Sequence, residues 1–320
     1  MFEFLKQERL LTEEDLHEKT EYLVDDFIVK CGITMWYARE GEGKTWFSLA
    51  LTRYILDHHR IKLFIYMDMD NPKHNIATRG IDQLMEKYRN LKVIHRSKID
   101  VSPHELLLEI GKEAYGNNYA DCVLLFDSTR DFVDRDMHND TKVREMMSIL
   151  KNIRDAGGTV LLNSHATKNG KGLDGSGEFA KSLDSLYRLK QIGKSDGVIH
   201  YHLPYEKERS AISDQYFSVI VSTLTLGDID PVIAGMNADD KEFVATVREE
   251  LAKHGDGINQ TKLLETLGYA KADKKARARL ESFAPMFWKV RDGSNRQKIF
   301  SLEEKEETQE TPETLPVSGA

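Results

Sequence analysis

The stretch MWYAREGEGKTWFSLALTRYI, residues 35–55, decides the fold class of this chain. An apolar run ends at Ala38, a loop with two glycines follows, and Lys44 and Thr45 open a segment of helix length. A strand, a glycine loop and a helix in this order predict a phosphate-binding loop, because N–H groups of the loop and of the first helical turn can surround a phosphate. The residues predicted to bind a nucleotide are Gly41, Glu42, Gly43, Lys44, Thr45 and Trp46.

Two side chains of this loop have predicted chemical roles. Lys44 would reach the terminal phosphates of ATP, and the hydroxyl of Thr45 would bind Mg²⁺. Ala38 stands where such a loop usually opens on glycine, and it lacks the freedom of glycine at positive φ. The alternative interpretation is a glycine turn that merely joins a strand to a helix.

Short apolar runs alternate with helix-length segments from about residue 21 onward. The predicted strands are 32–38, 62–68, 91–96, 121–127 and 158–164, with helices such as 44–60 and 140–157 between them. This alternation predicts an α/β fold with a mostly parallel central sheet. Two further strands, 198–206 and 215–223, have no helix between them and predict a terminal antiparallel hairpin.

Acidic residues end two of the predicted strands. Asp127 follows an apolar run in DCVLLFDS, and we expect it to hold Mg²⁺ through water. Hydrolysis also needs a carboxylate that orients the attacking water; Asp70 is the first choice for this role and Asp68 the alternative. Alternation places Asp68 and Asp70 on one side, near the phosphates if their strand neighbours the first. The structural alternatives are a helix-capping Asp127 and solvated loop acids.

The composition limits the classes of protein to which the chain can belong. A net charge of −8 excludes a polycation, so nucleic-acid contacts would need a local basic patch. Cys31 and Cys122 lie in apolar runs and are predicted to be buried thiols, without a disulfide framework or a metal site. No apolar run is long enough to span a membrane and acids occur early in the chain, so we expect a cytoplasmic protein without a membrane partner.

Composition also divides the chain into segments. Residues 1–20 predict a helical extension, 21–225 the α/β domain, 226–238 a linker, 239–302 a small domain and 303–320 a disordered acidic tail. The small domain has three predicted helices and then two short strands, which is the order of a winged helix-turn-helix.

The small domain is the basic part of the chain. Residues 239–302 hold 13 Lys or Arg against 10 Asp or Glu, although the chain as a whole is acidic. This footprint predicts phosphate contacts with DNA, and the alternative is a winged helix that docks another protein. The predicted DNA-contacting residues are Lys274, Lys275, Arg277 and Arg279 on the third helix and Lys289 and Arg296 around the wing.

The ordered set of motifs over residues 21–225 resembles the RecA-like ATPase core of RepA-type helicases. The matching stretches are YLVDDFIVKCGITMWYAREGEGKTWFSLAL, IYMDMDNP, VLLFDSTRDFV, GGTVLLNSHATK, GLDGSGEFAKSLDSLYRL and YEKERS. In the family they correspond to the entry into the phosphate loop, an Asp-x-Glu strand end, a second acidic strand, a sensor strand, a Gly-Ser segment with a helix, and a Lys-x-Arg hairpin.

The resemblance implies ATP and Mg²⁺ as cofactors and a homo-oligomer that binds ATP between subunits, for which a hexameric ring is the natural closed form. His165, at the end of the sensor strand, would sense the γ-phosphate. Lys168 and Lys171 lie in the loop that in such rings contacts single-stranded DNA. Lys207 and Arg209 would reach into the ATP site of the neighbouring subunit.

Three residues depart from the family pattern. Ala38 replaces the first loop glycine, Cys31 replaces a glycine before the first strand, and Asp70 replaces the glutamate. The last change shortens the reach of the carboxylate and puts the rate of hydrolysis in question.

The sequence therefore predicts a Mg-ATP-dependent DNA helicase or DNA-translocating motor in the replication of a plasmid, phage or similar element, with single- or double-stranded DNA as its partner. One alternative is a regulatory or loader ATPase that uses ATP as a switch and does not unwind DNA. The others are a DNA-binding regulator with a vestigial nucleotide site and a P-loop kinase for a small molecule.

Overall fold

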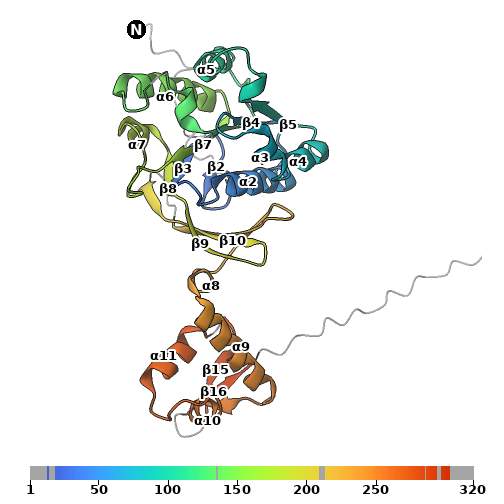
Figure 1. Cartoon of the computed structure of the whole chain (residues 1–320), viewed down its shortest axis with the longest axis vertical. Coiled ribbons are helices and arrows are strands. Elements are labelled where there is room, and N and C mark those ends of the chain that lie inside the picture. Colours follow the sequence, from blue (N-terminus) through green and yellow to red (C-terminus); the bar gives the residue numbers. More distant parts are fainter. Residues whose placement is uncertain are drawn as a thin grey trace, which may run out of the picture. The chain divides into compact units, whose positions relative to one another are not determined.

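The computed structural model describes residues 19–134, 136–208, 213–284, 286–293 and 297–302, together with Glu13. The chain forms two compact units, residues 1–234 and 235–320 (Figure 1). Most of the predicted N-terminal extension and the whole acidic tail, 303–320, lie outside the described residues. Within the described part, no helix is long and apolar enough to cross a membrane.

The described residues of the first unit form strands, α-helices and short 3₁₀ helices. Its strands are β1 (Tyr22–Val24), β2 (Ile28–Val29), β3 (Ile33–Ala38), β4 (Leu63–Asp68), β5 (Leu91–His95), β6 (Cys122–Asp127), β7 (Thr159–His165), β8 (Ser185–Arg188), β9 (Lys190–Ser195), β10 (Val198–Leu203), β11 (Tyr205–Glu208), β12 (Gln215–Ile220) and β13 (Thr225–Asp228). Its helices are α2 (Lys44–His58), α3 (Lys73–Ala77), α4 (Ile81–Lys87), η2 (Arg96–Lys98), α5 (Pro103–Lys112), η3 (Thr129–Phe132), α6 (Asp140–Asp155) and α7 (Glu178–Ser182), and α8 (Pro231–Gly235) follows at its end.

The central sheet confirms the predicted fold class. In the described residues it has seven strands in the order β11-β8-β3-β7-β6-β4-β5. All neighbours pair in parallel except β11, which is antiparallel to β8 at the edge. Strands β3, β4, β5, β6 and β7 are the five that the alternation predicted. Together with the loop between β3 and α2, this arrangement fits a RecA-like core.

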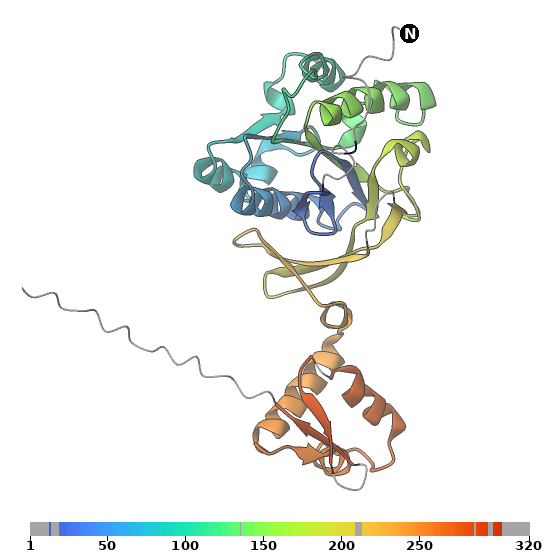
Figure 2. The same ribbon diagram turned by 180° about the vertical axis from the view of Figure 1, so that it is seen from behind.

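Helices cover both faces of this sheet, as Figures 1 and 2 show from opposite sides. Helices α5, α6 and α7 pack on one face, where Ile33, Met35 and Tyr37 of β3 are buried. Helices α2 and α4 pack on the other face, where Trp36 is buried. Because both faces are covered, β3 is buried along its whole length, which explains the continuous apolar run in its sequence.

A second sheet encloses α2 from its other side. Its order is β13-β12-β10-β9, all antiparallel, and β12 and β13 contact α2. Phe47 of α2 meets the rings of Trp36, Tyr201 and Phe217, with centroids 5.5 to 5.8 Å apart. Helix α2 is therefore buried between two sheets, which accounts for its apolar residues on more than one side.

Several details correct the sequence analysis. The predicted strand 198–206 is divided at Pro204 into β10 and β11, which belong to different sheets. The helix expected within 172–189 is limited to the five residues of α7, because 185–188 form β8 beside β3. Cys31 is exposed, not buried. It has a φ of 56°, in the left-handed region that favours the glycine it replaces.

The predicted linker, 226–238, is wrong in its first part. Residues 226–228 belong to β13, which pairs with β12, and Leu226 is buried in the cluster around α2. Gly227 and Asp228 suggested a loop, but backbone pairing at a sheet edge needs no particular side chain. Helix α8 occupies half of the remainder.

The second unit has its own hydrophobic core. It contains α9 (Ala238–Ala252), β14 (Ile258–Asn259), α10 (Gln260–Thr266), α11 (Lys274–Ser282), β15 (Lys289–Asp292) and β16 (Lys298–Ser301). The strands form an antiparallel sheet in the order β14-β16-β15. Trp288 and Phe300 are fully buried against the three helices, and Trp288 donates a hydrogen bond to the carbonyl of Leu280, 3.1 Å away.

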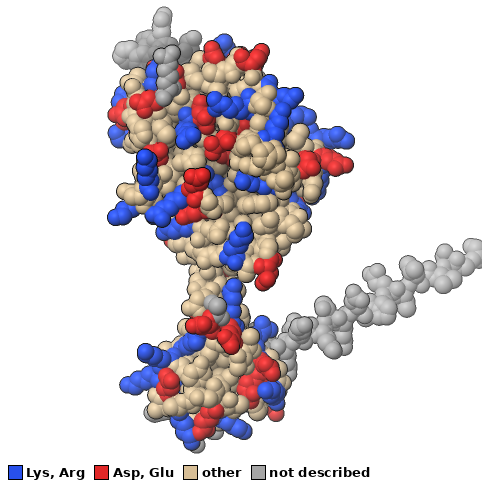
Figure 3. Space-filling view, viewed as in Figure 1, with Lys and Arg blue, Asp and Glu red and all other residues tan. Residues whose placement is uncertain are grey.

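Acidic and basic side chains alternate over the surface of both units on the face that Figure 3 shows. No extended area of one sign is visible on that face. Any attraction to a polyanion from this face would therefore come from a few residues and not from a broad field.

We predict that Phe47→Ala destabilises the first unit by about 3–5 kcal/mol, because it removes a buried ring from the contact between α2 and both sheets. Urea unfolding followed by circular dichroism would measure this loss. Tyr115→Ala, at a side chain that is 63% exposed, is the control and should change the free energy of unfolding by less than about 0.5 kcal/mol. A loss below about 1 kcal/mol for Phe47→Ala would contradict the enclosed position of α2.

Candidate nucleotide-binding site

The loop between β3 and α2 adopts the conformation that its glycines permit. Gly41 and Gly43 have φ values of 84° and 78°, in the left-handed region. Ala38 is the last residue of β3, paired in register with His165, and its φ is not positive. The missing first glycine therefore leaves no strain at this position, because the positive φ values occur only where glycine remains.

The second sheet holds the end of this loop. The hydroxyl of Tyr201, in β10, donates a hydrogen bond to the carbonyl of Gly43 over 3.0 Å. A Cβ atom on Gly43 would lie only 2.5 Å from that hydroxyl, whereas one on Gly41 would meet nothing within 4 Å. Gly43 is thus required by both its φ and its neighbour, and Gly41 by its φ alone.

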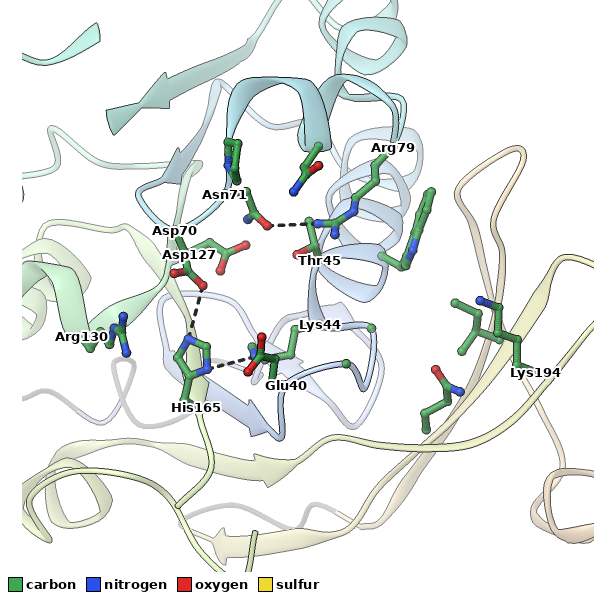
Figure 4. Close-up of a pocket in the computed structure, with 17 residues that line it drawn as sticks. Glu40, Lys44, Thr45, Asp70, Asn71, Arg79, Asp127, Arg130, His165 and Lys194 are labelled. Carbon is green, nitrogen blue, oxygen red and sulfur yellow. Dashed lines mark hydrogen bonds and ion pairs between the residues drawn. The ribbon is translucent and has the colours of Figure 1, made fainter. Parts of the chain in front are cut away.

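A cavity of about 650 Å³ opens at the N-terminus of α2 (Figure 4). Its size is within the range of small-molecule sites. Of the predicted residues it brings together Gly41, Gly43, Lys44, Thr45, Trp46, Asp70, Asp127 and His165. Strands β3, β4, β6 and β7 deliver these groups because their carboxyl ends meet at one edge of the parallel sheet.

Asp127 is the most deeply buried acid of the cavity. The Tyr66 hydroxyl donates to its Oδ2 over 2.9 Å, and the Asn163 amide donates to its Oδ1 over 2.8 Å. Burial raises the pKa of Asp127 to about 7, with the nearby Asp68 carboxylate adding to the effect. The carboxylate is therefore fixed in place but poorly solvated, and a nearby cation would favour its ionised form.

Asp68 and Asp70 have different surroundings. Asp68 is fully buried and accepts hydrogen bonds from the backbone and the side-chain amide of Asn71. Asp70 lines the cavity, and its contact with the His165 ring lowers its pKa. Their strand does not neighbour β3, since β7 and β6 lie between, but Asp70 reaches the cavity from the loop after β4.

His165 connects two groups of the cavity. Its Nδ1 lies 3.4 Å from Lys44 Nζ, and its Nε2 lies 3.4 Å from Asp70 Oδ2. A ring with its proton on Nε2 suits both contacts, because the ammonium donates and the carboxylate accepts. Burial lowers the pKa of Lys44. Both contacts are long for hydrogen bonds, so Lys44 can exchange the ring for a phosphate oxygen and Asp70 can exchange it for a water molecule.

These residues suit a magnesium nucleotide. No side chain caps the N-terminus of α2, so its first N–H groups are available to an anion. Lys44 adds a positive charge, and Thr45 and Asp127 supply the oxygen ligands that Mg²⁺ prefers, directly or through water. Gly41 and Gly43 line the cavity, and neither has a side chain that could cover the loop backbone there.

Several predicted residues of the first unit lie away from the cavity. Glu42 does not line it, and burial raises the pKa of its carboxyl group. Lys168 and Lys171 are exposed on the loop after β7. Lys207 donates to the carbonyls of Ala180 and Leu183, at the end of α7. Arg209 lies outside the described residues.

The predicted DNA-contacting residues of the second unit differ in their surroundings. Lys274, Lys275 and Lys289 are exposed, and Arg296 lies outside the described residues. The guanidinium of Arg277 donates to the carbonyl of Lys271. The guanidinium of Arg279 pairs with Asp240 over 2.6 Å and lies 4.4 Å from the centroid of the Phe243 ring.

The sequence analysis missed part of the cavity wall. The additional lining residues are Glu40, Asn71, Pro72, Asn75, Arg79, Arg130, Gln191, Lys194 and Ile199. Asn71 and Arg130 lie within the quoted stretches that contain Asp70 and Asp127, so their positions could have been read from the sequence. Nothing local marks Gln191, Lys194 or Ile199, because β9 and β10 reach the cavity only through the second sheet.

The comparisons with known proteins concern the fold. No protein-family model and no curated protein matches the sequence. One solved structure, described as an ATPase domain, is 11% identical, with a TM-score of 0.46 over 63% of this chain and 86% of that chain. A DnaB-like replicative helicase, described with its interactions with primase, is 13% identical, with a TM-score of 0.49 over 68% of this chain and 66% of that chain.

We predict that Gly43→Ala destabilises the first unit more than Gly41→Ala. Both changes place a Cβ at a positive φ, which costs roughly 1–2 kcal/mol, but only the first also meets the Tyr201 hydroxyl. Thermal unfolding of both variants measures the difference. Adding Tyr201→Phe should recover part of the loss in Gly43→Ala and none in Gly41→Ala, and equal effects in both backgrounds would refute the contact.

We predict a pH dependence of stability that Asp127 causes. Its pKa is about 7 in the folded chain and about 3.9 when unfolded. A carboxyl group whose pKa is raised by folding stabilises the folded state at any pH below its pKa in the unfolded chain. This contribution is lost as the pH rises from about 4 to about 7. We would measure urea unfolding without nucleotide or Mg²⁺. The free energy of unfolding of Asp127→Asn, minus that of wild type at the same pH, should therefore be larger at about pH 8 than at about pH 5. Asp100→Asn, at an exposed position, is the control; parallel profiles for wild type and Asp127→Asn would reject the assignment.

Proposed function

We propose that this protein is a Mg-ATP-dependent ATPase of the RecA type that works on DNA as a helicase or translocating motor. The observation that carries the proposal is the grouping of Lys44, Thr45, Asp70, Asp127 and His165 around the uncapped N-terminus of α2. A phosphate-binding backbone, a cation, metal-binding oxygens and a second carboxylate are the components that phosphoryl transfer to water requires.

Each residue has a defined part in this reaction. Lys44 and the first N–H groups of α2 bind the terminal phosphates, and Thr45 and Asp127 hold the metal ion, Asp127 through water. Mg²⁺ neutralises phosphate charge when bound. Asp70 orients the attacking water, since it lines the cavity with a lowered pKa and is ionised at neutral pH. His165 contacts both Lys44 and Asp70, and we assign to it the sensing of the γ-phosphate.

The proposal includes an oligomer in which neighbouring subunits complete each site. Arg209 would stabilise the transition state in the neighbouring subunit, as arginines supplied in trans do, and a hexameric ring is the natural closed form. Lys207 contacts α7 of its own chain, which favours a supporting role for it beside Arg209. Arg79 and Arg130 line the cavity of their own chain, so they are the competing candidates for the role given to Arg209.

Contact with DNA is the finer part of the proposal. Lys168 and Lys171 are exposed on one loop and would contact single-stranded DNA. The second unit has the element order helix, strand, helix, helix, strand, strand, which supports a winged helix with Lys274, Lys275, Arg277, Lys289 and Arg296 as its phosphate contacts. Arg279 would first have to leave Asp240 and Phe243. Replication of a plasmid, phage or similar element is the proposed setting.

A second function, an ATP switch that controls assembly or loading, is favoured by one observation. The carboxylate of Asp70 is shorter than the glutamate it replaces and already contacts His165. Slow hydrolysis would follow, and a long-lived ATP state suits a switch more than a motor.

We predict that single-stranded DNA increases ATP turnover and that Lys44→Ala and Arg209→Ala each reduce it by roughly 10³-fold or more. Turnover is measured for each variant with and without DNA. Arg89→Ala, at an exposed position, is the control and should keep wild-type turnover. Turnover that ignores DNA would favour the switch, and failure of the wild type to bind ATP would reject both functions.

The same two variants test whether sites are shared. In a mixture, a subunit with intact Lys44 can face a subunit with intact Arg209, so two inactive proteins should regain turnover when combined. Wild-type turnover in Arg209→Ala, or no recovery on mixing, would remove Arg209 from the reaction and direct attention to Arg79 and Arg130.

A further inference from the structure

The cavity has two chemically different ends. The residues with proposed roles in metal binding, phosphate sensing and water orientation, among them Asp70, Asp127 and His165, lie together, and Lys194 lies across the cavity from them (Figure 4). We call the far end of the cavity the five other lining residues Trp46, Arg79, Gln191, Lys194 and Ile199. It offers an aromatic ring, an apolar side chain, an amide and two cations. Of these, only Arg79 has a possible part in the proposed hydrolysis, as a competing candidate for the role of Arg209.

Trp46 directly follows the two residues that hold phosphate and metal, so its side chain starts at the base of the phosphate site. Its indole is half-buried against the core cluster around α2. The guanidinium of Arg79 lies 5.9 Å from the indole centroid, at the limit of a cation–π contact. The core therefore packs against the indole, while Arg79, its partner in the cavity, is too distant for a close contact.

The Arg79 side of this end is anchored to the sheet. Its guanidinium donates to the side-chain oxygen of Asn71 over 3.1 Å, and the amide of Asn71 donates to both oxygens of the buried Asp68. The backbone carbonyl of Asn71 also contacts His95 Nε2 at 2.9 Å. This chain of contacts fixes the position of Arg79 relative to the strand that delivers Asp70.

The opposite wall is anchored to the phosphate loop. Strands β9 and β10 pair so that Lys194 lies opposite Ile199, and Tyr201 in β10 donates to the carbonyl of Gly43. A Cβ on Gly43 would lie 3.7 Å from the side-chain oxygen of Gln191, so Gln191 borders the same loop. The hairpin and the phosphate loop therefore keep a fixed spacing.

We infer that this end is the base site of the nucleotide and that a purine base stacks on Trp46 against the β9–β10 hairpin. The inference rests on the proposed function, since it places the base of the same nucleotide. Stacking on an aromatic ring favours the larger purine surface. Ile199 supplies apolar contact, and the Gln191 amide, which both donates and accepts, can pair with a polar edge of the base.

Calorimetric titration of the full chain with Mg·ATP, Mg·CTP and magnesium tripolyphosphate tests this inference. Tripolyphosphate carries the phosphates without a base, so it reports the phosphate end alone. Wild type should bind ATP more tightly than CTP. Trp46→Ala should weaken ATP binding by roughly 5- to 150-fold, the range for base–aromatic stacking, and leave tripolyphosphate affinity unchanged. Trp46→Phe should keep most of the ATP affinity.

Tyr54→Ala is the matched control, because Tyr54 is another half-buried aromatic residue of α2 that stacks on His58 and does not line the cavity. It should leave all affinities unchanged. An equal loss of ATP and tripolyphosphate affinity in Trp46→Ala would show that the ring only supports the phosphate end. Unchanged ATP affinity in this variant would place the base elsewhere. Either result overturns the inference. If wild type binds neither Mg·ATP nor magnesium tripolyphosphate, the proposed function itself is overturned.

Discussion

The burial of helix α2 between two sheets is the constraint on which the rest of the first unit depends. Its first residue, Lys44, follows a glycine held in the left-handed region, and its aromatic residue Phe47 packs against rings from both sheets. Because interiors are close-packed, such a helix cannot slide or rotate without opening a cavity. The position of the helix N-terminus, and of the anion that it can bind, is therefore decided by hydrophobic packing that begins one turn beyond the phosphate loop.

Burial away from water decides the ionisation of the acidic residues at the ends of β4 and β6. Asp127 and Asp68 are both buried, and each is held by neutral donors, Tyr66 and Asn163 for the first and Asn71 for the second. Neutral donors orient a carboxylate but compensate little of its charge. Carboxylates held in this way favour a nearby cation, which agrees with the metal role proposed for Asp127. Asp70, in contact with His165, is not held in this way and remains ionised.

The second sheet contributes more to the cavity than its place in the sequence suggests. It covers α2, holds the carbonyl of Gly43 through Tyr201, and presents Gln191, Lys194 and Ile199 to the cavity. One antiparallel sheet thus joins the core, the phosphate loop and the far wall. A change in its register would move all three, since a shift of one residue turns each side chain to the opposite face.

The sequence alone determined the α/β class, the five inner strands, the phosphate loop and the cavity residues Lys44, Thr45, Asp127 and His165, because these depend on local patterns: apolar runs, glycine positions and polar residues at strand ends. Only the tertiary structure decided which of Asp68 and Asp70 faces the cavity, that β8 is a strand beside β3, that residues 226–228 pair as part of β13, and that the β9–β10 hairpin supplies a wall. These outcomes depend on contacts between residues far apart in the chain. Backbone pairing and packing carry little signature in any single stretch of sequence, and for that reason Asn163, Tyr66 and Arg79 could be assigned only once their partners were in place.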